Sequence, residues 1–319
     1  RWGTNEIQPD TRHPRYSGSY TATGGNDYMS NSLMAYMTGK DDNAYSAPFN
    51  FDPRTLFYFY RQVSSTPGIF GAPANEETLE CGLQTPPAHY AGYVFCGVAK
   101  GWWGRDHGNN NGIPPDGFYR ALAGVYPAGG KLDDWSYGGQ QDGAGFGGNG
   151  ITPIMLASWT DFMIGELELV GGNEAAAKNS MFAGMQKSMD KVLTFKEPTA
   201  RFTAIMDIYF GGIDQVISDF YARTSDEWDD ATDKMNVLGM QYFVAQFGNG
   251  LDAYNFYRRT GYPTTLQFTV EPTPGNFVRS FFYPADEATP NPNVEQKPNV
   301  DGQVFWDNNP SSPGFPSAN

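Results

Sequence analysis

Two aromatic-rich clusters in the sequence contain the residue types that bind sugars. The first cluster holds Trp102, Trp103, Arg105 and Asp106, and the second holds Trp135 and Tyr137 beside Asp133, Asp134 and Gln140. Sugar rings present apolar C–H faces that stack on flat aromatic rings, while their hydroxyls exchange hydrogen bonds with charged and amide side chains. We therefore predict a ligand site made of Trp102, Trp103, Arg105, Asp106, Tyr119, Trp135 and Tyr137. The alternative for each tryptophan is that it packs in a core beneath the loops.

The same stretch also contains carboxylates that could support hydrolysis. Asp106, His107 and Asp116 share one loop, and Asp133-Asp134 lie nearby. Glycoside hydrolases use two carboxylates, but a chain with 35 acidic residues has neighbouring carboxylates by chance. The three histidines lack metal-binding spacing, and no nucleophile-elbow, phosphate-loop or dinucleotide fingerprint occurs. We predict no catalytic residue, and a secreted glycoside hydrolase that uses these carboxylates remains the alternative.

Possible calcium ligands lie in the same loop. Oxygen-bearing side chains occur at Asp106, Asn109, Asn111 and Asp116. Their spacing does not fit an EF-hand, because no Glu falls at the twelfth position from any Asp. Asn and Asp are also ordinary turn formers. We therefore predict neither a bound metal nor a cofactor.

Composition limits the partners of this chain. Its net charge is −14, so its surface repels nucleic-acid phosphates and anionic lipid headgroups, whereas neutral sugars carry no such penalty. The sequence contains no run of 18 apolar residues, which is about the length that spans a membrane. The sequence starts at Arg1 without an initiator Met, a signal peptide or a lipidation Cys. We therefore expect that Arg1 is not the natural start, and that any membrane attachment uses a lipid anchor not present in this chain.

Loops must position the predicted site. Residues 1–30 read as irregular, with a short helix predicted from Ser30 to Met37 and a strand over the aromatic run 55–60. Residues 64–150 are dense in Gly and Pro and contain no convincing helix. A loop region this long in a domain is usually functional. Seven glycines within the thirteen residues 138–150 predict a connector that is either flexible or tightly turned.

Helical patterns begin at Thr152. We expect Thr152 to cap a helix with Pro153 at its first position, and Gly171-Gly172 to end it. Asn173 then caps a second helix over residues 175–193. A further helical stretch spans residues 202–220 and breaks near Gly211-Gly212, and Asp226 is expected to cap the next helix.

The last part of the helical region predicts an αα-hairpin. Apolar residues recur at helical spacing from Met235 to Ala245, the Gly248-Asn249-Gly250 break ends that helix, and a second helix precedes Gly261. Arg258-Arg259 are expected to pair with Asp286 and Glu287, which would pin the C-terminal segment onto the helices.

Residues 241–263 of this hairpin resemble the C-terminal signature of the SusD/RagB family, in particular its starch-binding outer-membrane lipoprotein branch. The resemblance continues through Arg279, Tyr283-Pro284, Glu287, Asn291, Asn293 and Val304-Phe305-Trp306-Asp307, and Asp52-Pro53-Arg54 is similar upstream. It implies a mostly α fold with tetratricopeptide-like helix pairs, a loop-rich and aromatic-rich lobe, and few short strands.

The resemblance also implies a function. Members of the family are surface-exposed outer-membrane lipoproteins that bind oligosaccharides or other nutrients without cleaving them and deliver them to a SusC-like TonB-dependent transporter. Within one structural domain, residues 1–150 would form the lobe with the ligand site, 151–290 the helical region and 291–319 an extended tail, and the family's N-terminal helix pairs are expected to be missing. The ligand is a glycan or a peptide, and a protein-binding helical scaffold remains a further alternative.

The two cysteines, Cys81 and Cys96, also bear on the compartment. In an oxidising compartment they would pair, and in the cytosol they would be free and buried. The resemblance favours the pair.

Overall fold

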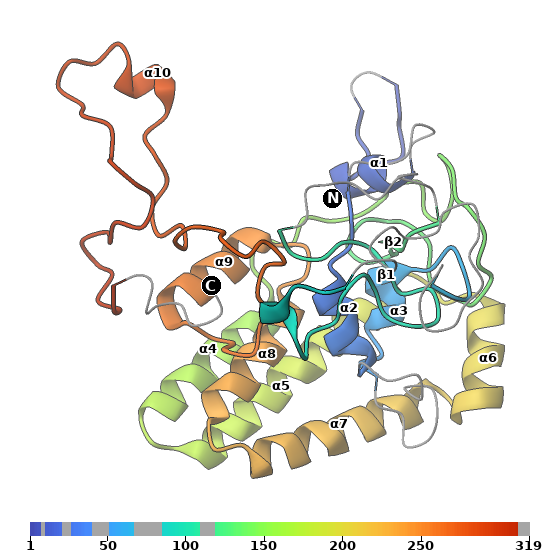
Figure 1. Ribbon diagram of the computed structural model, residues 1–319. Coiled ribbons are helices and arrows are strands. Elements are labelled where there is room, and N and C mark those ends of the chain that lie inside the picture. Colours follow the sequence, from blue (N-terminus) through green and yellow to red (C-terminus); the bar gives the residue numbers. More distant parts are fainter. Residues whose placement is uncertain (8–9, 21–26, 40–50, 67–84, 109–118, 312–319) are drawn as a thin grey trace.

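Helices dominate the computed structural model, which describes residues 1–7, 10–20, 27–39, 51–66, 85–108 and 119–311 (Figure 1). The helices are α1 (Pro14–Tyr20), α2 (Asn31–Thr38), α3 (Thr55–Tyr58), α4 (Ala157–Val170), α5 (Glu174–Leu193), α6 (Ala200–Phe210), α7 (Ile213–Asp230), α8 (Lys234–Ala245), α9 (Gly250–Thr260) and α10 (Ala285–Ala288). Strands β1 (Phe59–Tyr60) and β2 (Leu122–Ala123) pair antiparallel, and Ala88–Tyr90 form a 3-10 turn, η2. The mostly α fold with few short strands is confirmed.

Helices α4 and α5 form an antiparallel pair. The hydroxyl of Ser180 donates to Glu168 at 2.6 Å near the connecting turn, and Lys187 pairs with Asp161 at the other end. Asn173 accepts from the backbone N–H of Ala176 and caps α5, as the sequence predicts. Helix α8 packs on this pair through Trp159, Phe162, Met181, Met185, Leu238 and Tyr242.

Two further pairs of consecutive long helices follow, α6–α7 and α8–α9. Gly211 and Gly212, both at positive φ, separate α6 from α7 where the sequence predicts a break. In the predicted hairpin, the ring of Tyr242 in α8 contacts Phe256 in α9 at 4.9 Å. The tetratricopeptide-like character of the pairs remains a prediction.

Two predicted helix starts are wrong. Helix α4 starts at Ala157, and Thr152 instead accepts a hydrogen bond from the indole of Trp2 at 2.9 Å, which ties it to the N-terminal segment. Asp226 lies inside α7, and the helix that follows is capped by Asp233, which accepts from the N–H of Asn236.

The aromatic run 55–60 is helical at its start rather than fully extended. Asp52 accepts from the backbone N–H of Arg54 at 2.9 Å and from the Arg54 guanidinium, and its carbonyl accepts from the N–H of Thr55. This buried pair folds the chain into the turn that becomes α3, so tertiary context overrides the strand preference. Helix α1 was also missed, because residues 1–30 read as irregular.

The loop-rich lobe shares a core with the ends of the helices. Phe57, Phe59 and Trp102 from the lobe pack in one cluster with Val192, Phe202 and Met206 from α5 and α6. The lobe and the helical region therefore bury apolar surface against each other.

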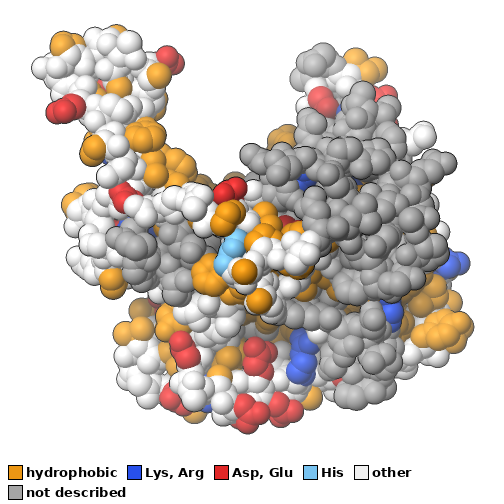
Figure 2. All heavy atoms as spheres, in the orientation of Figure 1, with side chains coloured by type: hydrophobic (Ala, Val, Ile, Leu, Met, Phe, Trp, Pro, Cys, Tyr) orange, Lys and Arg blue, Asp and Glu red, His pale blue; other side chains and the backbone are white. Residues whose placement is uncertain are grey.

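Charge is distributed unevenly over the surface. Carboxylates of α7 occur at Asp214, Asp219, Asp226, Glu227, Asp229 and Asp230, and acidic side chains gather along the lower edge of the molecule in Figure 2. Within the described residues, no helix combines the length and the apolar character that a membrane span requires.

Residues 270–311, here called the C-terminal arm, extend from the body and carry the short helix α10 (Figure 1). The buried guanidinium of Arg279 pairs with Asp307, and Asn309 donates to the carbonyl of Arg259 at 2.8 Å. The predicted partners of the arginine pair are wrong. Arg259 pairs with Glu166 on α4, Arg258 donates to the carbonyl of Arg279 at 2.9 Å, and Asp286 and Glu287 lie in exposed α10.

Candidate ligand-binding groove

The two adjacent tryptophans of the predicted site are buried. Trp102 and Trp103 are each 1% exposed, and Trp102 belongs to the core that the lobe and the helices share. Neither ring can stack on a sugar in this conformation. The alternative stated for them, packing beneath the loops, is what the structure has.

One aromatic residue of the first cluster and both of the second converge on a buried cation, Arg61. Its guanidinium carbon lies 4.4 Å from the ring centroid of Trp102, 5.8 Å from that of Trp135 and 5.3 Å from that of Tyr137. Arg61 also donates to both carboxylate oxygens of Asp133 and to the carbonyl of Lys100 at 3.1 Å. The aromatic cluster therefore serves a buried ion pair.

Asp106 and Arg105 are also engaged by the protein itself. Asp106 is buried and accepts from the side chain of Asn31 at 3.1 Å and from the backbone N–H of Cys96 at 2.9 Å. Burial raises the pKa of Asp106, although both hydrogen bonds oppose the shift. Arg105 stacks over Tyr28 at 4.0 Å. Asp106 thus positions two segments of the lobe and lacks access to a substrate.

Tyr119 is the predicted aromatic residue that is most open to solvent, at 38%. Asp134 accepts from the hydroxyl of Thr199 at 3.0 Å, so both members of Asp133-Asp134 have structural partners. Asn109, Asn111, Asp116 and Cys81 lie outside the described residues. Cys96 itself is disulfide-bonded, and its predicted pairing with Cys81 remains a prediction. Among the described residues, no group of acidic, His or Cys side chains could hold a metal ion.

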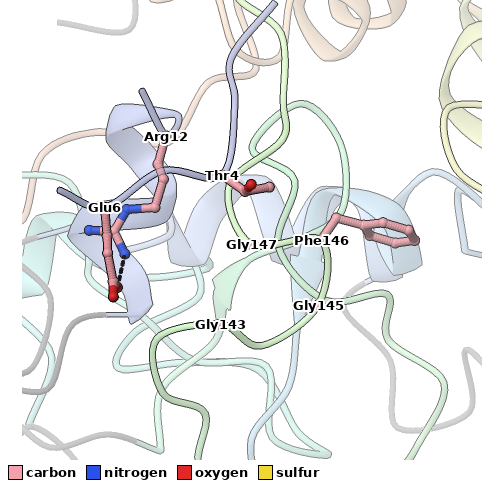
Figure 3. A pocket seen from close by; sticks show the side chains of 7 residues that line it. All are labelled: Thr4, Glu6, Arg12, Gly143, Gly145, Phe146 and Gly147. Carbon is pink, nitrogen blue, oxygen red and sulfur yellow. Dashed lines mark hydrogen bonds and ion pairs between the residues drawn. The ribbon is translucent and has the colours of Figure 1, made fainter. Parts of the chain in front are cut away.

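A pocket lies elsewhere, against the Gly-rich loop (Figure 3). It has a volume of about 400 Å³, and its walls are Thr4, Glu6, Arg12, Gly143, Gly145, Phe146 and Gly147. Phe146 is 36% exposed, and Figure 3 shows its ring at the end of the pocket opposite Glu6 and Arg12. Arg12 is held by Asp10, Asp142 and Glu6, and hydrogen bonds from Arg12 lower the pKa of Asp10.

The Gly-rich loop is tightly turned. Of the two forms predicted for residues 138–150, a flexible connector and a tightly turned one, the structure has the second. The N–H groups of Phe146 and Gly148 both donate to the carbonyl of Gly129, and Gly148 accepts from the N–H of His13. At Gly148, φ is +84° and a Cβ would lie 2.7 Å from that of Arg12, so glycine is needed there. The loop thus holds Phe146 on a fixed backbone.

A second pocket has a volume of about 210 Å³. Its walls are Arg1, Asn149, Gly150, Ile151, Lys191, Thr194, Phe195 and Lys196. The ammonium of Lys196, a wall residue of the second pocket, lies 5.1 Å from the ring of Phe146 in the first and 5.4 Å from that of Phe195, so wall residues of the two pockets are in contact. We call the two pockets together the Phe146 groove. It is built from the N-terminal segment, the Gly-rich loop and the end of α5.

Sequence reasoning missed this groove because it ranked aromatic residues by density. Phe146 is a single aromatic between Gly145 and Gly147. Neighbours without side chains leave a ring uncovered. That signal was present in the Gly-rich block, which was interpreted only as a connector.

Comparison with known proteins agrees with the helical part of this structure. A family model described as SusD-like, the Susd and RagB outer membrane lipoproteins, matches residues 154–303. Residues 154–303 of this chain, just under half of it, are therefore similar to SusD-like proteins. The SusD-like region extends from just before α4 into the C-terminal arm, so it includes Lys191 and Lys196 of the groove but not the Gly-rich loop. The outer-membrane localisation predicted from the sequence agrees with the family description. No curated protein and no solved structure matches the chain.

Proposed function

We propose that this protein captures oligosaccharides at the outer membrane, in the Phe146 groove, without cleaving them. The observation that carries the proposal is an exposed aromatic ring on a rigid loop, with hydrogen-bonding side chains on both sides. The first pocket alone falls in the size range of small-molecule sites. SusD-like proteins are in general nutrient-binding, which supports the same conclusion.

The absence of cleavage rests on the acidic groups of the groove. Among the described residues that line it, Glu6 is the single carboxylate, and it pairs with Arg12 at 3.4 Å. Glycoside hydrolysis ordinarily needs two carboxylates on either side of the scissile bond. A groove lined by one carboxylate that is already paired favours binding.

The test compares Phe146→Ala with Tyr119→Ala. Calorimetry against a panel of oligosaccharides is expected to show roughly fivefold weaker binding for Phe146→Ala, because one aromatic stacking contact is worth about 1 kcal/mol. Tyr119→Ala removes an exposed aromatic of the sequence-predicted site, outside the groove, and is expected to bind like the unchanged protein.

Two outcomes would contradict this proposal. Loss of affinity in Tyr119→Ala with none in Phe146→Ala would place the ligand at the first aromatic clusters. New reducing ends in the incubated oligosaccharides would show hydrolysis and favour the loop carboxylates instead.

We further propose that delivery to a SusC-like TonB-dependent transporter uses the C-terminal arm. Five aromatic side chains of the arm are exposed, namely Phe281, Phe282, Tyr283, Phe305 and Trp306, with Phe305 at 98%. Hydrophobic side chains are also visible along the arm in Figure 2. Exposed aromatic groups of this kind mark protein contacts. This observation also supports the scaffold alternative, in which protein binding is the main role.

The arm is tested with the double substitution Phe281→Ser and Phe282→Ser. It is expected to lower retention by an immobilised, detergent-purified SusC-like transporter by about tenfold or more, while oligosaccharide affinity stays unchanged. Phe146→Ala is the matched control and should be retained normally. Equal retention of all three proteins would exclude the arm as the docking segment.

A further inference from the structure

Lys191 and Lys196 differ from Lys178 and Lys187 of the same helical region in their ion pairing. On α5, Lys178 pairs with Asp229 and Lys187 pairs with Asp161. Within the described part of the chain, neither Lys191 nor Lys196 has a carboxylate within ion-pair distance, although the protein carries 35 acidic residues against 21 basic ones. Two lysines that have no acidic partner among the described residues therefore line one pocket, against the overall charge.

Both lysines face the second pocket of the Phe146 groove, together with Arg1. No acidic side chain is among the described residues that line this pocket. The nearest carboxylates in sequence are Asp190, whose Oδ1 accepts from Gln186 at 2.8 Å, and Glu197, which is exposed. The pocket thus has a positive wall in a protein of strongly negative net charge.

A simpler explanation covers only part of this arrangement. Lys191 lies in the last turn of α5, where the helix dipole favours a cation. Lys196 lies beyond the helix end, between the rings of Phe146 and Phe195, and Arg1 comes from the other end of the sequence. The dipole therefore does not account for three cations from separate segments at one pocket.

We propose that the groove takes an acidic oligosaccharide, one that carries carboxylate or sulfate groups. The anionic group lies in the second pocket against Lys191 and Lys196, and the neighbouring sugar ring stacks on Phe146. This inference rests on the proposed function and adds the ligand class to it. The overall negative charge repels acidic chains, so such a ligand is held only where this local wall offsets that repulsion.

The experiment uses pairs of ligands that differ only in charge. An oligouronate is compared with its methyl-esterified form, and a sulfated oligosaccharide with its desulfated form, by calorimetry at low and high salt. We expect at least one charged member to bind about tenfold tighter than its neutral partner, and added salt to reduce this preference. The pair that shows the preference identifies carboxylate or sulfate as the recognised group.

Three variants locate the preference. Lys191→Gln and Lys196→Gln are each expected to weaken binding of the charged ligand by about three- to fivefold, with little change for the neutral one. Lys187→Gln removes the same charge from α5 outside the pocket and should keep the full preference.

The outcomes separate this inference from the function on which it rests. Equal binding of charged and neutral ligands, or a preference that survives both lysine substitutions, would overturn the acidic ligand and leave oligosaccharide capture intact. Absence of binding to every oligosaccharide would overturn both.

Discussion

At the scale of single residues, the main result is that residue type alone did not separate a ligand site from a core. Trp102, Trp135 and Tyr137 have the composition of a sugar platform, yet their rings surround the guanidinium of Arg61. The sequence contains no sign of this, because Arg61 lies about 40 residues upstream of the first cluster. Long-range pairing of a buried cation could not be predicted from spacing.

One residue-scale prediction concerns pH and His13. Burial lowers the pKa of His13 from 6.5 to about 4, although a hydrogen bond to the backbone at Ile151 and the charge of Asp27 act in the opposite direction, and Arg15 adds to the lowering. Between these values the unfolded chain binds the proton and the folded protein does not. The free energy of unfolding should therefore fall as pH drops from about 6.5 to 4, by on the order of 2–3 kcal/mol.

Urea unfolding at several pH values measures this loss. His13→Gln is the informative variant, because it removes the titrating group and should flatten the dependence in this window. His89→Gln, which changes an exposed histidine, should leave the dependence in place. An unchanged slope in His13→Gln would refute the assignment.

At the scale of elements, helices were predictable where glycine and capping residues interrupt regular apolar patterns. The break at Gly211-Gly212 and the cap at Asn173 are local signals, and the structure has both. Thr152 and Asp226 carry equally good local signals but do not begin helices. The hydroxyl of Thr152 accepts a hydrogen bond from Trp2, about 150 residues away in sequence. A partner that distant cannot be predicted from the residues around Thr152.

Close packing of α4 on α5 leads to the element-scale prediction. A Cβ on Gly184 would lie 2.9 Å from two ring atoms of buried Phe162. Gly184→Ala should therefore lower the free energy of unfolding by about 1–3 kcal/mol, even though Ala favours helix. Gly250→Ala at the start of α9 meets no atom within 4 Å and should be neutral or slightly stabilising. Thermal melts of both variants measure the contrast, which equal melting temperatures would contradict.

At the scale of the whole molecule, the C-terminal arm is held to α9 by contacts at its base. Arg279 and Asp307 form the buried pair at its base, and Asn309 adds hydrogen bonds to α9. The prediction that the C-terminal segment is pinned to the helices is correct in kind, but the residues named for it, Asp286 and Glu287, are not the ones that do it. The family resemblance predicted that the C-terminal segment packs on the helices. The residues that hold it there could be identified only from the structure.

The anchor yields the whole-molecule prediction. Asp307→Ala leaves the guanidinium of Arg279 without its carboxylate, so limited proteolysis should cut residues 270–311 several times faster while the helical core stays intact. Burial by itself would raise the pKa of Asp307, but hydrogen bonds from Arg279 and Asn309 and the Arg279 charge together lower it. The anchor should therefore hold at neutral pH and weaken only as pH falls through that lowered pKa. Asp286→Ala in exposed α10 is the control, and equal cutting of both variants would rule out this anchor.

The positions of the tryptophans also give the protein its own optical reporters. Trp102, Trp103, Trp159 and Trp228 are at most 3% exposed, so their emission should be blue and respond to unfolding rather than to ligand. Trp2 touches the groove through its hydrogen bonds to Gly150 and Thr152, and Trp306 is 48% exposed on the arm. Iodide quenching of tryptophan fluorescence should therefore report two events. The quenching of Trp2 should change when a ligand fills the groove, and that of Trp306 should change when a partner covers the arm. A titration followed by total fluorescence would mostly record the core and would pass over both events.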